Sequence, residues 1–223
     1  MKKSIILTIS LLMAGAFAAS AQDCTLFFPQ KEGTKLTYTN YSKPGKVDSY
    51  LTYLIKNKNS DQSRITIEAE NLNAKGKSEL KYEFDAWCED GSFYIDMRNM
   101  ISSMQVKDIE GFKIETNDLH FPSTMKEGQQ LKDASMKMSM QGPISMAMSV
   151  SITNRNVEAV EDISTPAGTF KCCKISSVVK SDMGFIKVEN QVTEWYSENI
   201  GMVKSVTQNK GKVISTCELT KVE

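Results

Sequence analysis

Apolar and polar residues alternate along most of this chain with a period of two, the pattern of a β-strand that buries one face. The clearest example is the segment 135–152, in which two alternating runs are separated by Gln141-Gly142-Pro143. The apolar positions are Met136, Met138 and Met140 in the first run, and Met146, Met148, Val150 and Ile152 in the second. Two such runs on either side of a turn signal predict a β-hairpin with one methionine-rich face.

Similar runs recur through the rest of the chain, and turn signals such as Lys43-Pro44-Gly45-Lys46 separate them. The predicted strands cover residues 34–42, 47–56, 112–120, 131–140, 144–160, 168–180, 185–196, 202–208 and 212–221, with two more around Ile65 and from Leu80 to Ala86. Short strands with regular turns predict an all-β fold. We expect a single β domain over residues 22–223, an antiparallel meander that forms a barrel or an open half-barrel.

One segment departs from the period of two. Met97, Met100, Ile101 and Met104 are spaced at i, i+3, i+4 and i+7, which predicts one short amphipathic helix near 97–104. A helix of this length is marginal by itself. We therefore expect it to dock on the sheet or to cover an open end of the barrel.

The first residues have the features of a secretory signal peptide. Lys2 and Lys3 precede an apolar run at 5–17, and Ala19-Ser20-Ala21 forms an A-x-A cleavage site. The sequence therefore predicts a signal peptide over residues 1–21, cleavage near Ala21, and a periplasmic or secreted protein. No later apolar run approaches the roughly 18 residues of a transmembrane helix, so no membrane span is expected.

The charge of the chain argues against nucleic acid as a partner. Its 27 basic residues balance its 27 acidic residues, and the basic residues form no cluster. A protein that binds nucleic acid needs a concentrated positive surface.

Five cysteines, Cys24, Cys88, Cys172, Cys173 and Cys217, follow the predicted cleavage site. An oxidising compartment favours disulfides, but an odd count leaves at least one thiol free. Our first choice is Cys24–Cys88, which would tie the N-terminal segment to a central strand. A second bridge from Cys172 or Cys173 to Cys217 is the weaker alternative.

The sequence offers no positive sign of catalysis. His120 is the only histidine, which excludes sites built from several histidines, and a structural role suits it best. The chain has no Gly-x-Ser-x-Gly elbow, no phosphate-binding glycine loop and no Cys-x-x-Cys pair. We therefore predict a protein that is not an enzyme and that uses no cofactor and no metal.

The methionines leave three alternatives open: ordinary core, the lining of a cavity for an apolar small molecule or lipid, or a thioether site for Cu(I). The absence of a nearby histidine or cysteine weakens the copper alternative. A structural or assembly role with an envelope protein is a further alternative to ligand binding. The candidate cavity-lining residues are Met97, Met100, Met104, Met136, Met138, Met140, Met146 and Met148.

Several blocks of the sequence resemble the TapB-like family of exported bacterial proteins, a family of unassigned function. They are Phe28–Thr34, Cys88–Met97, Phe121-Pro122-Ser123 with Gly128-Gln129, Glu161–Phe170 and Trp195–Lys204, of which Thr165–Phe170 and Trp195-Tyr196 are the most specific. The resemblance implies a mainly antiparallel, barrel-like β fold. It transfers no catalytic residue.

Overall fold

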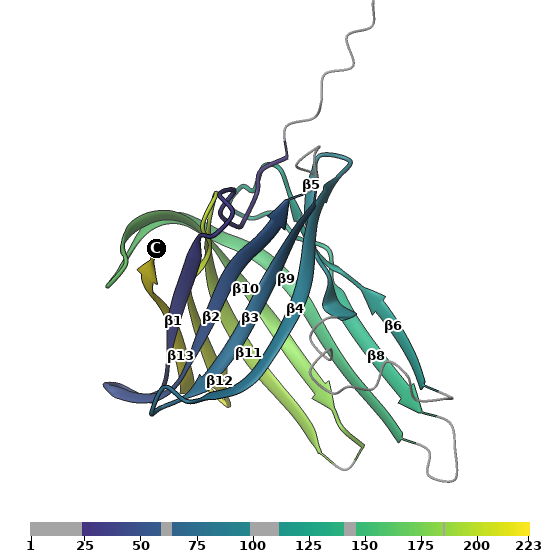
Figure 1. Cartoon of the computed structure of the whole chain (residues 1–223). Coiled ribbons are helices and arrows are strands. Elements are labelled where there is room, and N and C mark those ends of the chain that lie inside the picture. Colours follow the sequence, from purple (N-terminus) through teal and green to yellow (C-terminus); the bar gives the residue numbers. More distant parts are fainter. Residues whose placement is uncertain (1–23, 59–63, 99–111, 141–145, 185) are drawn as a thin grey trace, which may run out of the picture.

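A computed structural model describes residues 24–58, 64–98, 112–140, 146–184 and 186–223. Within these ranges one antiparallel sheet contains all thirteen strands, in the order β6-β8-β9-β10-β11-β12-β13-β1-β2-β3-β4-β5-β7 (Figure 1). Their bounds are β1 Lys35–Lys43, β2 Lys46–Lys58, β3 Arg64–Asn73, β4 Ser78–Glu89, β5 Ser92–Ile95, β6 Phe112–Asn117, β7 Leu119–Pro122, β8 Ala134–Met140, β9 Met146–Thr165, β10 Gly168–Asp182, β11 Lys187–Ser197, β12 Gly201–Asn209 and β13 Lys212–Val222.

The sheet curls into a nearly closed barrel because its two end strands are consecutive in the chain. β6 and β7 are separated only by Asp118, and the first pairs with β8 while the second pairs with β5. A single extended segment therefore changes partners at Asp118 and joins the two ends of the sheet. A carboxyl oxygen of Asp118 accepts a hydrogen bond from the backbone N–H of Met97 at 3.0 Å, which fixes this crossing point. The predicted all-β antiparallel barrel is confirmed.

The period of two decides which side chains enter the barrel. On β3, Ile65, Ile67 and Ala69 are buried and alternate with polar residues. Glu68, which lies between two of them, forms ion pairs with Lys56 and Lys81 at 3.6 and 2.9 Å. One face of the strand therefore builds the core, and the other carries ion pairs.

The methionine hairpin forms as predicted. β8 pairs with the start of β9, so that Met138 lies opposite Met148 and Met136 lies opposite Val150. The predicted turn, Gln141-Gly142-Pro143, lies outside the described residues.

The segment before β1 crosses one end of the barrel (Figure 1). The ring of Phe27 lies 5.2 Å from that of Phe121 and 6.1 Å from that of Phe93, measured between centroids. The backbone N–H of Asn199 donates to the carbonyl oxygen of Leu26 at 2.7 Å. We call residues 24–28 the N-terminal plug, because this segment covers that end of the barrel and buries Phe27 and Phe28.

The helix predicted near 97–104 falls mainly outside the described residues. Met97 and Arg98, the part that is described, have 3₁₀-helical backbone and follow β5 after Asp96. The described ranges contain no α-helix.

Candidate functional site

A cavity of about 310 Å³ lies inside the barrel beneath the N-terminal plug. This volume is at the lower end of the range of roughly 300–1,000 Å³ that is usual for small-molecule sites. Its aromatic walls are Phe28, Tyr53, Tyr82, Phe84 and Tyr196, its aliphatic walls are Ile95, Met97, Leu119, Ile152 and Met202, and two carboxyl groups, Asp96 and Glu194, complete the lining. An apolar pocket with few polar groups is the usual form of a site for an apolar ligand.

The aromatic walls are held in place by ring contacts. Phe28 packs edge-on against Tyr53 and Phe84, with centroids 5.8 and 5.9 Å apart, and Tyr53 contacts Phe84 at 5.5 Å. These rings come from the plug, β2 and β4, so the docked plug contributes one aromatic wall of the cavity through Phe28. Burial raises the pKa of Tyr53 and of Tyr82, which keeps both phenols neutral.

The two carboxyl groups of the cavity have different surroundings. Arg98 donates from Nε and Nη2 to the two carboxyl oxygens of Asp96, both at 3.1 Å, so the charge of Asp96 is balanced. Glu194 receives one long hydrogen bond, from the hydroxyl of Tyr196 at 3.4 Å. Burial raises the pKa of Glu194, and the opposing effect of the Arg155 charge is smaller.

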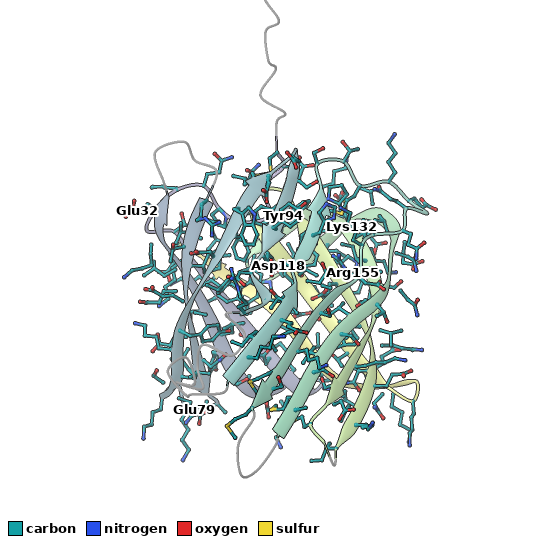
Figure 2. All side chains as sticks on the ribbon, turned by 90° about the vertical axis from the view of Figure 1, so that its right-hand side faces the viewer. Glu32, Glu79, Tyr94, Asp118, Lys132 and Arg155 are labelled. Atoms are coloured by element: carbon teal, nitrogen blue, oxygen red, sulfur yellow. A yellow bond between two sulfur atoms is a disulfide. The ribbon has the colours of Figure 1, made fainter. Side chains whose placement is uncertain are left out.

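Arg155 on β9 is a buried cation, with 2% of its surface exposed. Its Nη1 donates to the carbonyl oxygens of His120 and Lys132, at 2.9 and 2.7 Å, and its guanidinium lies 5.1 Å from the centre of the Phe121 ring. Figure 2 shows Arg155 and Lys132 on the side of the barrel that also carries Asp118 and Tyr94. Burial lowers the pKa of Arg155. Arg155 therefore ties β9 to β7 and to the loop before β8.

His120 lies in the barrel wall on β7. Its ring packs edge-on against Tyr94 with the centroids 5.0 Å apart, and its Nδ1 is buried with no hydrogen-bond partner among the described residues. Burial lowers the pKa of His120, and the nearby positive charges of Lys132 and Arg155 lower it further.

This pKa shift predicts a loss of stability in mild acid. Because the folded state disfavours the imidazolium, the unfolded chain binds the proton first, and stability falls as the pH drops below about 6.5. We expect the variant His120→Phe to lack this contribution, so its free energy of unfolding relative to wild type should rise between about pH 7.5 and about pH 5. Urea unfolding of both proteins at the two pH values measures the difference, and an unchanged difference would contradict the prediction.

The structure places the predicted methionines at different depths. Met97 lines the cavity. Met136 and Met138 are buried in the adjoining core, Met148 packs against that core, and Met140 is half-buried. Met146 is in register opposite Met140. Met100 and Met104 lie outside the described residues. Within the described ranges, no group of three His, Cys, Asp or Glu side chains could hold a metal ion.

The sequence analysis did not select Glu194, Met202, Tyr53 or Tyr82 as cavity residues. A signal was present, because Glu194 is two residues before Tyr196 on one strand and therefore shares its face.

Cys24 and Cys88 form a disulfide, with their Cα atoms 6.0 Å apart, and this is the pair that the sequence analysis preferred. The second bridge is not formed, since Cys172, Cys173 and Cys217 are free. β10 and β13 are separated by β11 and β12, so Cys217 is about 14 Å along the sheet from Cys172 and Cys173, too far for a disulfide. Burial raises the pKa of Cys172 and of Cys217 to about 12, which keeps both thiols protonated.

A larger hollow, of about 550 Å³, lies at the β1–β2 turn between Tyr41, Pro44 and Val213. Its lining includes the ion pair of Lys204 with Glu218 and the hydroxyls of three short side chains. Tyr41 is the one aromatic side chain that its described lining contains, whereas the interior cavity has five, so we take the interior cavity as the candidate site.

The fold and the cavity define an antiparallel β-barrel protein with an apolar interior site. The chain belongs to the DUF3108-like family, whose model matches residues 31–219. Comparison with curated protein sequences gave no match.

Two crystal structures share the fold. One is described as a putative exported protein with YmcC-like fold from Bacteroides fragilis; it is 23% identical, with a TM-score of 0.73, and the match covers 90% of this chain and 100% of that chain. The other is described as a putative lipoprotein from Parabacteroides distasonis; it is 25% identical, with a TM-score of 0.75 and coverage of 91% and 100%. No helix within the described residues is long and apolar enough to cross a membrane.

Proposed function

We propose that this protein is an exported, non-catalytic β protein that binds an apolar small molecule or lipid inside its barrel. The main support for this proposal is the cavity of about 310 Å³, whose walls are aromatic rings, methionine and aliphatic side chains. The two similar structures, described as an exported protein and a lipoprotein, support a place in the cell envelope. Within the DUF3108-like family, the Thr165–Phe170 and Trp195-Tyr196 blocks support a TapB-like assignment.

The lining argues for binding rather than catalysis. Of the two carboxyl groups, Asp96 is held by Arg98 and Glu194 contacts a tyrosine hydroxyl, so neither is paired with a nucleophile or a histidine among the described residues. The tyrosines stay neutral because burial raises the pKa of each. Binding of an apolar ligand here is favourable, because the ligand leaves water for a preformed apolar site.

Filling the cavity tests the proposal. We expect the neutral fluorophore N-phenyl-1-naphthylamine to bind the purified protein, and Met202→Trp to weaken its binding about tenfold because the larger ring occupies the site. Met183→Trp is the matched control, since Met183 is exposed at the turn after β10. Fluorescence titration measures both affinities. Equal affinities of the two folded variants, or no binding by wild type, would overturn the proposal.

The second candidate is docking on an envelope protein. The β10–β11 turn exposes Met183, Ile186 and Val188, with 51, 61 and 39% of their surfaces accessible. Exposed apolar side chains at one hairpin tip are typical of a contact surface. If wild-type protein binds no apolar probe, this surface becomes the better explanation of the role of the fold.

A further inference from the structure

Building on the proposed function, we infer that Glu194 selects the head group of the bound molecule. The structure assigns to the cavity an amphiphile with an apolar body and a head group that donates hydrogen bonds, such as an alcohol or an amine. A carboxylate head group is disfavoured.

Glu194 faces the interior from the middle of β11. It is paired across the sheet with Ile175 on β10 and with Ser205 on β12, and Ile175 is part of the buried core. A carboxylate can accept about four hydrogen bonds. Among the described residues the only hydrogen bond that Glu194 receives comes from the Tyr196 hydroxyl, at 3.4 Å, so most of its acceptor capacity is left for a ligand.

Among the charged groups near the cavity, Glu194 is the one that is available to contact a ligand. Asp96 also lines the cavity, but Arg98 holds both of its oxygens at 3.1 Å. Arg155 does not line the cavity; its Nη1 is directed at two carbonyl oxygens and its guanidinium is covered by Phe121. A bound anion would therefore face a carboxyl group without contacting a cation.

Burial of the Glu194 carboxyl group favours a ligand that donates a hydrogen bond to it. Desolvation raises its pKa, because burial penalises the ionised form unless a hydrogen bond stabilises it. A ligand O–H or N–H would supply one, and hydrogen bonds to a charged group inside a protein are stronger than neutral ones. A second carboxylate would instead add repulsion at low dielectric.

The test uses one tail with three head groups: 1-decanol, decylamine and decanoate, each titrated into the full protein by calorimetry at neutral pH. We expect the alcohol and the amine to bind at least about tenfold more tightly than decanoate, the ratio that one charge-assisted hydrogen bond provides. Glu194→Gln should reduce this ratio to less than about threefold. Glu189→Gln, on the same strand but in an exposed ion pair with Lys180, should preserve it.

Folding of Glu194→Gln is checked by urea unfolding at neutral pH. Because the raised pKa means that stability is lost as the pH rises above about 4.5, removing the ionisable group should make the variant more stable than wild type at neutral pH.

Equal binding of the three head groups by wild type, or an unchanged ratio in Glu194→Gln, would overturn the inference and leave the proposed function intact. Absence of binding by all three ligands and by N-phenyl-1-naphthylamine would overturn both. If Glu194→Gln does not fold, Glu194→Asp must still lower the ratio for the inference to hold.

Discussion

Replacement of Gly201 by alanine should lower the free energy of unfolding by about 3–5 kcal/mol, the sum of backbone strain and a steric clash. Gly201 opens β12 with φ of +101°, a conformation that residues with a side chain rarely adopt. An alanine Cβ at this position would lie 2.6 Å from the carbonyl oxygen of Phe27. The obstacle is backbone of the N-terminal plug, so relief requires the plug to move.

Gly211→Ala separates the two contributions. Gly211 has φ of +76°, but no atom lies within 4 Å of the position that its Cβ would take. We therefore expect a loss of about 1 kcal/mol there, from strain alone. Urea unfolding of both variants measures the difference, and equal losses would show that the plug does not dock against β12 in solution.

Removal of the Cys24–Cys88 disulfide should have the second large effect. The bond closes a loop between residues 64 apart in sequence, and loop-closure entropy assigns about 4 kcal/mol to a loop of this size. The double variant Cys24→Ala/Cys88→Ala is therefore expected to unfold at a much lower urea concentration. The bond also joins the plug to β4, so the loss includes weaker docking of Phe27 and Phe28.

Two controls accompany this measurement. Wild-type protein under reducing conditions should match the double variant, because the same covalent link is absent. Cys173→Ala, at a half-buried free thiol on β10, should change stability by less than about 1 kcal/mol. A double variant as stable as wild type would show that the plug is held by packing alone.

The sequence predicts the strands of this fold well because alternation is a local property. The register of Met138 opposite Met148 follows from two alternating runs and a turn, and neither requires knowledge of the rest of the chain. Ile65, Ile67 and Ala69 mark the interior face of β3 in the same way.

Features that depend on distant partners could not be predicted. The change of partner at Asp118 was missed, because the run 112–120 reads as one strand and alternation does not name its neighbours. The second disulfide was wrong for the same reason, since only the strand order shows how far Cys217 is from Cys172. The plug was also missed, because the successive Phe27 and Phe28 follow no strand or helix period.

Glu194 illustrates a limit of a different kind. β11 has half-buried residues on both faces, so it has no clear inward side. A carboxylate on such a strand is normally expected to face solvent. Only closure of the barrel places the face of Tyr196 and Glu194 inside.

The pairing of the first strand with the last has a consequence for the order of events during folding. Lys35 and Glu223 exchange two backbone hydrogen bonds, each of 2.9 Å, across almost the whole length of the chain. β1 is synthesised well before β13, so the edge that β1 offers to β13 stays open until β13 is available. Contacts so distant in sequence form slowly, and an open edge invites pairing with other chains. The unfolded chain should therefore depend on protection from aggregation until β13 can pair with β1.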